Sequence, residues 1–400
     1  MSAQVPPLKR NNYLQTSNII QQMKYLIILE TLFGINRLYI ISGYRKWILW
    51  LSYIYDVTLH FLVGFLIIIN TFGVINQHFY KITTVVEYFL LFCSALLLQR
   101  HKLSNFFTRL QTFDENLNIS TEVSILCPKR WYLYGLGVLI VYSVLENLYS
   151  VLFVFQTHDF SLLADLNYLP VMAHDMEMVL FCYFLITILQ RLSILKAHVA
   201  KVFSINTKDR IDCEDSSKLE DLSKRVNLNV SSVHRLYDLL HKCSEDLNSV
   251  MSLSMIVMTV TSGLSTIVIL KNTIKLFQST TTPPYLNAKH QLISRQAILI
   301  FSIGRSLKYI LMLTFPCYIS NKTQVQVSVI RTMIYDTLNS IQLDKVERRK
   351  VKAFFQLVCE NKYAYALYGI VNLDMLLPLS YSSLCTTYLI IVVQFSKLFD

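Results

Sequence analysis

The stretch WILWLSYIYDVTLHFLVGFLIIINT, residues 47–71, decides the class of this protein. It contains one acid and no Lys or Arg, and an α-helix needs an apolar run of about 20 residues to cross a bilayer. The whole chain shares this character, because 53% of its 400 residues are hydrophobic and only 16% are charged. A soluble fold has no place for so much apolar surface, so we expect an all-α, polytopic membrane protein.

Comparable apolar runs recur along the chain. The seven predicted spans are 47–71, 82–98, 132–155, 169–190, 250–270, 296–318 and 364–393. The segments between them share the basic residues unequally, because 29 of the 37 Lys and Arg fall in the N-terminal segment and in every second connection after it. The positive-inside rule therefore predicts a cytoplasmic N-terminus and, after seven spans, an extracellular C-terminus.

The net charge of +11 does not indicate a nucleic-acid partner. Nucleic-acid-binding proteins carry their basic residues in polar, water-exposed domains, whereas these residues sort by side of the membrane and suit anionic cytoplasmic lipid head groups. The eight cysteines lie in spans or cytoplasmic segments, so we expect reduced thiols. The sequence has no HExxH, GxSxG or P-loop motif and no His/Cys cluster, so we expect no enzyme activity, cofactor or metal.

The same pattern divides the chain into segments. They are a cytoplasmic N-terminal segment (1–46), a six-helix membrane bundle (47–318) with a cytoplasmic helical extension (191–249), a cytoplasmic anchor segment (319–363), and a last helix with a short extracellular tail (364–400). The apolar stretch 19–35 is too short and too charged to span, so we place it at the cytoplasmic interface or as a cap on the bundle. Apolar stripes in the extension and the anchor predict helices that continue out of the membrane and pack within one subunit or between subunits.

The end of the last span carries polar and aliphatic side chains on one face. Thr387, Ile390 or Ile391, and Gln394 recur at one-turn steps and therefore lie on the same side of the helix. Four or more such helices around an axis would form a lumen with a hydroxyl ring, an aliphatic constriction that gates by dewetting, and a neutral amide ring. The negative end of the helix dipole at the outer mouth would favour cations. Alternatively, Gln394 only marks the membrane interface at the end of an ordinary span.

This segment resembles the signature of insect gustatory receptors. The pattern is Thr-Tyr, five aliphatic residues and Gln-Phe near the C-terminus, with a less strict part upstream. The matching residues are Thr387, Tyr388, 389–393, Gln394 and Phe395, and upstream Gly369, Leu373 and Asp374. Pro378 departs from the pattern, because within a span it would kink or open the helix.

The resemblance implies a ligand-gated, non-selective cation channel in the plasma membrane of gustatory receptor neurons. It implies a tetramer, made of one kind of subunit or of several gustatory receptor subunits. It also implies that the last helix of each subunit lines the pore, with Gln394 and Phe395 near the gate. The small-molecule tastant would then bind among the first six spans, in a pocket open to the outside.

Ionisable side chains inside spans are costly and are therefore candidates for function. The candidates for ligand binding, with two tyrosines close to one of the acids, are Glu87, Tyr142, Glu146, Tyr149, His174, Asp175 and Glu177. An acidic, aromatic cleft would suit a protonated amine, and no Trp lies near the outer side to stack on a sugar ring, which favours a bitter or aversive compound. Alternatively, each acid forms a structural pair with Arg305 or Lys308, which also lie within a span.

Helical spacing limits how these residues can act together. Asp175 and Glu177 cannot share one helical face, so we expect at most one of them to point into the pocket. Asp56 and His60 are four residues apart in the first span and lie deeper, so we expect them to make internal packing or gating contacts.

Other classes of membrane protein fit the sequence less well. A G-protein-coupled receptor would need the opposite orientation, with most of the basic residues outside. A secondary transporter would show paired broken helices in its two halves, and none is apparent. An insect odorant receptor shares the architecture and is the closest alternative, and the intact signature favours the gustatory family.

Overall fold

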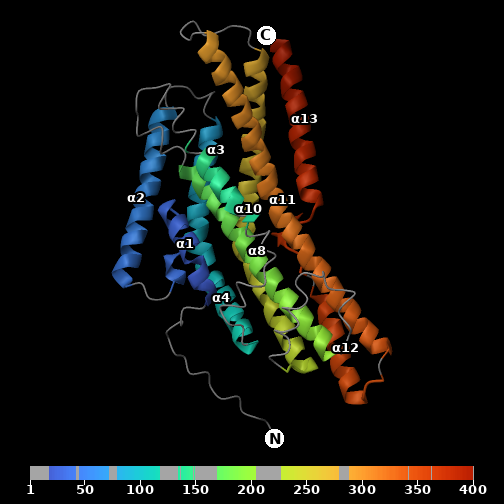
Figure 1. Ribbon diagram of the computed structural model, residues 1–400. Coiled ribbons are helices and arrows are strands. Elements are labelled where there is room, and N and C mark those ends of the chain that lie inside the picture. Colours follow the sequence, from blue (N-terminus) through green and yellow to red (C-terminus); the bar gives the residue numbers. More distant parts are fainter. Residues whose placement is uncertain are drawn as a thin grey trace.

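The computed structural model is mostly helical, and its long helices run side by side (Figure 1). It describes residues 18–41, 45–71, 79–117, 134, 135, 137–146, 148, 169–203, 227–278, 288–340, 342–361 and 363–399. The described elements are α1 (Asn18–Leu32), η1 (Leu38–Ile40), α2 (Lys46–Thr71), α3 (Phe79–Cys93), η3 (Ser94–Leu98), α4 (Gln99–Asn116), α8 (Leu169–Val202), α10 (Val230–Gln278), α11 (Ala288–Ser340), α12 (Lys345–Glu360), β1 (Ala366–Leu367), β2 (Val371–Asn372) and α13 (Leu376–Phe399).

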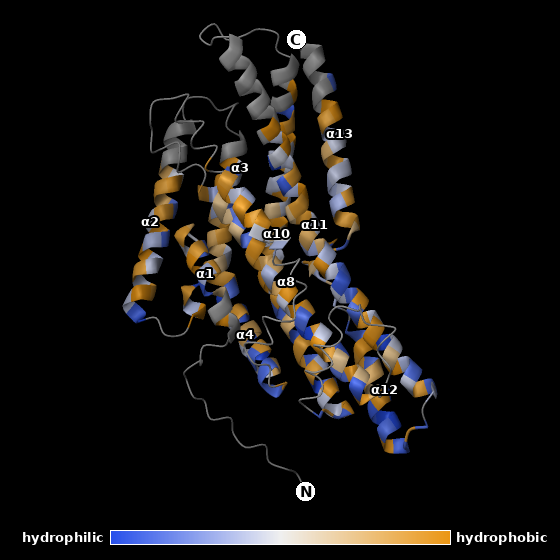
Figure 2. Ribbon diagram, viewed as in Figure 1, coloured by the Kyte–Doolittle hydropathy of each residue, from blue (hydrophilic) through white to orange (hydrophobic). Residues whose placement is uncertain are grey.

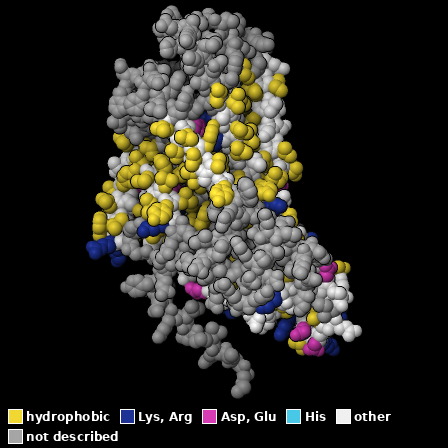
Figure 3. All heavy atoms as spheres, in the orientation of Figure 1, with side chains coloured by type: hydrophobic (Ala, Val, Ile, Leu, Met, Phe, Trp, Pro, Cys, Tyr) yellow, Lys and Arg dark blue, Asp and Glu magenta, His cyan; other side chains and the backbone are white. Residues whose placement is uncertain are grey.

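Apolar helices form the part of the fold that suits a membrane. Four of the described helices are long and apolar enough to cross one, and two shorter apolar helices accompany them; the six are Lys46–Phe65, Ile82–Asn116, Leu169–Val202, Val230–Lys271, Gly137–Glu146 and Leu376–Ile391. Hydrophobic residues concentrate in the upper part of the view and polar residues gather at the lower ends of α4 and α12 (Figure 2). The visible surface carries yellow apolar side chains around the same level (Figure 3). The chain is therefore a multi-pass membrane protein.

Two helices are much longer than a membrane is thick. α10 has 49 residues and α11 has 53, which correspond to about 74 and 80 Å at 1.5 Å per residue. The hydrocarbon core of a bilayer measures only about 30 Å. Both helices therefore leave the membrane as continuous rods, as the apolar stripes in the sequence predict.

α8 is the central helix of the bundle. Nearly every side chain from Pro170 to Ala200 is buried, including polar and charged ones. A helix that is apolar on all sides has no face to give to water and is surrounded by other helices. α8 packs against α1, α3, α10 and α11, so its ionisable side chains find their partners on those helices.

The N-terminal helix α1 packs on the helical bundle with one buried face. Ile20, Met23 and Ile27 are buried, and the helix packs against α8. Of the two charged residues that interrupt this stretch, Lys24 is exposed and Glu30 is buried. Glu30 pairs with the buried Arg37, which follows the helix, so its charge does not prevent α1 from packing on α8.

The apolar stripe of α12 packs within the subunit. On α12, Val351, Phe354 and Val358 are buried, and the Phe354 ring lies 5.9 Å from that of Tyr237 on α10. The hydroxyl of Tyr237 donates a hydrogen bond to the carbonyl of Asn361 at 3.0 Å. Burial raises the pKa of Tyr363, next to this contact, well above its ordinary value, so its hydroxyl stays protonated.

The last helix begins later than the sequence predicts. A two-stranded antiparallel hairpin, with Ala366 opposite Asn372 and Leu367 opposite Val371, occupies the start of the predicted span 364–393. Gly369 turns this hairpin at a φ of 70°, which glycine adopts without strain. An average of hydropathy does not detect such a turn, so the apolar hairpin residues were counted as part of the span.

The later start removes the kink expected at Pro378. α13 begins at Leu376, so Pro378 lies in the first turn, where a missing N–H breaks no helical hydrogen bond. Asp374 caps this turn, because its Oδ1 accepts hydrogen bonds from the backbone N–H of Leu376 at 3.0 Å and of Leu377 at 3.2 Å. α13 therefore runs as one helix from a defined N-terminus.

The cap leads to a stability prediction. Replacing Asp374 by Ala removes the acceptor for two N–H groups and should destabilise the start of α13 by about 1 kcal/mol. The full-length protein in detergent should melt at a lower temperature, and Asp374→Asn should retain most of the stability. Asp344→Ala is the matched control, because Asp344 occupies the N-cap of α12 without a side-chain cap bond. Equal melting temperatures for Asp374→Ala and the control would contradict the capping role.

Candidate ligand-binding site

A lysine inside the bundle holds two of the predicted acids together. The Nζ of Lys308 on α11 lies 2.9 Å from Oδ2 of Asp175 on α8 and 2.5 Å from Oε2 of Glu146 on the helix Gly137–Glu146. Arg305, one turn before Lys308, lies 3.2 Å from Oε1 of Glu146. The hydroxyl of Ser143 donates a hydrogen bond to Asp175. Three helices therefore meet at one ion-paired cluster.

A second buried pair lies beside the first. Nδ1 of His174 on α8 lies 2.5 Å from Oε1 of Glu87 on α3. The other ring nitrogen of His174 lies 3.1 Å from the hydroxyl of Ser262 on α10. The imidazole therefore connects α3, α8 and α10 through one side chain.

Tyr309 joins the two clusters. Its ring meets the His174 ring edge-on at a centroid distance of 5.8 Å, and the Lys308 ammonium lies 5.2 Å from its centroid. Tyr142 lies against the same helix, since its hydroxyl occupies the place that a Cβ at Gly304 would need. The ionisable side chains are thus flanked by two tyrosines, which gives a small molecule both hydrogen-bonding and aromatic surface.

The site is balanced in charge and is not the acidic cleft that the sequence suggested. Lys308 and Arg305 neutralise Glu146 and Asp175, and His174 faces Glu87. This is the alternative of structural pairing, and it arises because an unpaired carboxylate is too costly in an apolar interior. The carboxylates of Glu146 and Asp175 are therefore already paired with cations.

Glu177 belongs to a different cluster. As the spacing requires, it points away from Asp175, and its two oxygens accept hydrogen bonds from Nη1 and Nη2 of Arg37 at 2.6 and 2.8 Å. Arg37 also pairs with Glu30 and donates from Nη2 to the side-chain oxygen of Gln99 at 2.5 Å. This arginine therefore ties the N-terminal segment to α8 and α4.

Gln99 extends the same cluster to α10. Its amide nitrogen donates to Oγ of Ser254 at 3.1 Å, to the carbonyl of Val250 at 3.3 Å and to Oγ of Ser94 at 3.1 Å. Ser94 begins the π-helical segment η3 and Gln99 follows its end; irregularities of this type often occur at functional positions. The Gln99 side chain points into the bundle, where it forms hydrogen bonds with both Arg37 and α10.

The remaining pair in the first span has a packing role. The His60 ring stacks on Tyr88 at 4.1 Å and lies 4.1 Å from Phe92, and its Nδ1 is 2.8 Å from the carbonyl of Asp56. Both Asp56 and His60 are buried. These are internal contacts between α2 and α3, as the sequence position suggests.

One turn of α10 links the candidate site to the last helix. Ser262 contacts His174, and the hydroxyl of Thr266, four residues later, lies 3.1 Å from that of Tyr381 on α13. Tyr381 also packs with Leu313 of α11 and Cys385 in a small buried cluster. A displacement of α10 or α11 at the site therefore reaches α13 through direct contacts.

The signature residues lie on an uncovered face of α13. Thr387, Tyr388 and Gln394 are exposed in the single subunit, and Ile390 and Ile391 are 52% and 40% exposed. The Phe395 side chain lies outside the described residues, as does Tyr149. An apolar face of this kind needs lipid or other subunits against it.

The sequence pointed to part of this site only. The structure brings four of the predicted residues to one place, namely Glu87, Glu146, His174 and Asp175. Glu177 lies in the other cluster. Composition and spacing give no signal for the uncharged side chains that complete the site or connect it to α13, because such residues are common in any span; they are Ser143, Ser262, Tyr309 and Tyr381. Arg37 and Gln99 of the other cluster lie outside the predicted spans or at their border. Among the residues that the structure describes, no His, Cys, Asp and Glu side chains are grouped to hold a metal ion.

Comparisons with known proteins give the family and the fold that this chain resembles. The profile of a family described as 7tm Chemosensory receptor matches residues 31–399. A search of curated proteins found no match. The fold is similar to that of the insect olfactory receptor OR5 from Machilis hrabei, in complex with eugenol (TM-score 0.64, 14% identity) and in a second structure (TM-score 0.63, 12% identity). Each of these likenesses covers 94% of this chain and 98% of the other.

Because the cluster is ion-paired, we expect single and double substitutions in it to change the stability of the protein unequally. Lys308→Met leaves one buried negative charge without a partner and should destabilise the protein by roughly 3–5 kcal/mol. Adding Asp175→Asn restores neutrality around Arg305 and Glu146, so the double variant should melt at a higher temperature than Lys308→Met. Lys350→Met on α12 is the control, with little effect expected because Lys350 is exposed. A double variant less stable than Lys308→Met would contradict the charge-balance argument.

Proposed function

The chain belongs to the 7tm chemosensory receptor family, and we propose that it is a gustatory receptor, a non-selective cation channel that a small-molecule tastant opens. The observation that carries this proposal is the intact signature on α13. Thr387, Tyr388, Gln394 and Phe395 all have the residue types of the gustatory pattern. They lie within one uninterrupted helix, which a pore-lining element requires.

The uncovered face of α13 supports the channel proposal. Thr387, the two isoleucines and Gln394 fall on one side of the helix and have no covering in the described subunit. Four subunits around an axis would place hydroxyl, aliphatic and amide side chains along a common lumen. An aliphatic ring excludes water until it widens, and an amide ring replaces part of the hydration shell of a cation without trapping it.

The contacts from the candidate site to α13 support gating by a ligand. A compound bound among Tyr142, His174 and Tyr309 would bear on α10 through Ser262 and on α11 through Lys308. Both helices pack on Tyr381 of α13. Binding therefore changes the balance between two arrangements of the last helix, to the extent that the ligand prefers one of them.

The charge balance of the site refines the class of tastant. A protonated amine would have to compete with Lys308 and Arg305 for Glu146 and Asp175. A neutral, partly aromatic compound with hydrogen-bonding groups keeps those pairs and stacks on the tyrosines. The site has tyrosines and no Trp among its described contributors, which favours a bitter or aversive compound over a sugar.

The proposal includes a location and an assembly. The protein would lie in the plasma membrane of gustatory receptor neurons, with a cytoplasmic N-terminus and the end of α13 outside. It would work as a tetramer, either of this chain alone or with other gustatory receptor subunits. The exposed Trp47 and Trp50 at the start of α2 suit the cytoplasmic interface of such an arrangement.

An insect odorant receptor is the second candidate function. It is favoured by the likeness in fold to the Machilis hrabei olfactory receptor. At 14% identity this likeness concerns the fold, and the family profile covers chemosensory receptors in general. The signature on α13 gives the gustatory function the stronger support.

If the protein is itself the channel, a ligand should evoke a cation current without an intermediate signalling protein. Expressed in a cell line and exposed to a panel of bitter compounds, sugars and odorants, the protein should pass a cation current. Its onset should persist when G-protein signalling is blocked, because α10 and α11 connect the ligand site to the last helix within the same chain. The matched control is a cell expressing a G-protein-coupled receptor, whose response should disappear. Complete loss of the current under the blockade would refute the channel proposal.

The position of Gln394 predicts an effect on permeation. Gln394→Ala removes the amide from the proposed lumen and should change ion selectivity or basal leak by a factor of several, with surface expression unchanged. Thr386→Ala is the control, because Thr386 is also exposed but points about 80–100° away around the helix. Unchanged conductance and leak in Gln394→Ala would show that this face does not line the pore.

A further inference from the structure

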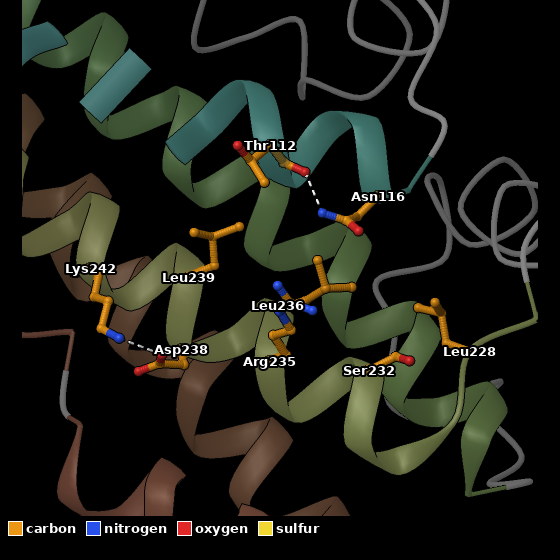
Figure 4. Close-up of a pocket in the computed structure, with 9 residues that line it drawn as sticks. All are labelled: Thr112, Asn116, Leu228, Ser232, Arg235, Leu236, Asp238, Leu239 and Lys242. Carbon is orange, nitrogen blue, oxygen red and sulfur yellow. Dashed lines mark hydrogen bonds and ion pairs between the residues drawn. The ribbon is translucent and has the colours of Figure 1, made fainter. Parts of the chain in front are cut away.

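A cavity lies far from the candidate ligand-binding site, between the C-terminal end of α4 and the N-terminal end of α10. Its volume is about 340 Å³, within the usual range of small-molecule sites. Figure 4 shows that its walls come from two helices. The lining residues are Thr112 and Asn116 of α4, and Leu228, Ser232, Arg235, Leu236, Asp238, Leu239 and Lys242 at or near the start of α10.

The cavity combines cationic groups with an apolar wall. No hydrogen bond or ion pair joins the Arg235 guanidinium to any residue in the described part of the chain, so its donors are available to a ligand. The Lys242 ammonium lies 2.7 Å from Oδ2 of Asp238, which leaves two of its three protons free. Leu228, Leu236 and Leu239 supply the apolar part of the lining.

The electrostatics of the cavity favour an anion. Its lining holds two cations and one carboxylate. Arg109 and Asp246 nearby neutralise one another at 2.9 Å. The partial positive charge at the N-terminus of α10 is offset by the partial negative charge at the C-terminal end of α4, so the excess of cationic side chains decides the sign. Asn229 caps α10 by accepting from the backbone N–H of Ser232 at 2.8 Å.

We propose that this cavity binds a small organic phosphate with an apolar or aromatic part, of the nucleoside phosphate class. The phosphate would accept hydrogen bonds from Arg235 and Lys242, a pairing that is both charge-assisted and directional for a guanidinium. The nucleobase would pack against the side chains of Leu228, Leu236 and Leu239. Neither a bare inorganic anion nor an uncharged nucleoside uses both parts of the lining.

The position of the cavity favours a soluble ligand over a lipid head group. Lys242 and Ser232 precede the predicted membrane boundary at 250 by about 12 and 27 Å along the helix, at 1.5 Å per residue. A head group anchored in the bilayer would have to leave it to reach Arg235. We therefore assign the phosphate to a cytoplasmic solute.

A bound phosphate would strengthen the contact between α4 and α10. These helices are already joined by Lys102 with Ser249, and by Arg109 with the carbonyl of Lys242 at 3.2 Å. α10 continues to Ser262 and Thr266, which contact the candidate ligand-binding site and α13. Modulation of the current by the phosphate rests on the proposed function, whereas the binding itself does not.

Binding is tested on the purified full-length protein by titration calorimetry, without any measurement of current. The probes are ADP, adenosine, inorganic phosphate, and nanodiscs that contain a phosphoinositide. ADP should bind more tightly than adenosine or phosphate. Arg235→Ala should weaken ADP binding about tenfold or more, while the exposed Arg331→Ala on α11 should leave it unchanged.

A gain of affinity keeps the test independent of folding defects. Asp238→Asn removes the only carboxylate of the lining and frees Lys242, so ADP should bind several-fold more tightly. The proposal is overturned if ADP does not bind, if Arg235→Ala and Arg331→Ala weaken it equally, or if only the phosphoinositide nanodiscs bind. Failure of these measurements would leave the tastant-gated current intact, and a missing current would leave the binding result intact.

Discussion

Lys308 holds Asp175 and Glu146 at one buried point, and the arrangement of the surrounding helices follows from the need to keep these charges paired. In an apolar interior an isolated carboxylate or ammonium group is too costly to maintain. α8 therefore has to present Asp175 to α11, and the helix Gly137–Glu146 has to present Glu146. The same constraint bears on the position of α1, because Arg37 must reach both Glu30 and Glu177.

These ion pairs also belong to the chain of contacts that joins the candidate site to the last helix, α13. His174 and Tyr309 connect the paired cluster to α10 and α11, and both helices contact Tyr381 of α13. The contacts from this cluster to α13 therefore run through packed side chains of α10 and α11, with no loop between them.

The sequence predicted the helical membrane fold and the candidate residues better than it predicted their partners. Apolar runs and the i, i+4 spacing of stripes depend on local chain geometry, so the helical membrane class and the long rods α10 and α11 could be predicted from them. The start of α13 could not, because the hairpin Ala366–Asn372 is as apolar as the helix that follows. Pro378 seemed to interrupt a helix only because that start was misplaced.

What the sequence by itself determined is the class of protein, the set of costly side chains in the spans, and the residues of the signature on one face of α13. These follow from composition and periodicity, which each segment carries alone. Only the tertiary structure decided that Asp175 meets Lys308 while Glu177 meets Arg37, since the partners are separated by 133 and 140 residues. It also decided that the site is neutral, because charge balance is a property of helices brought together and no single segment contains it.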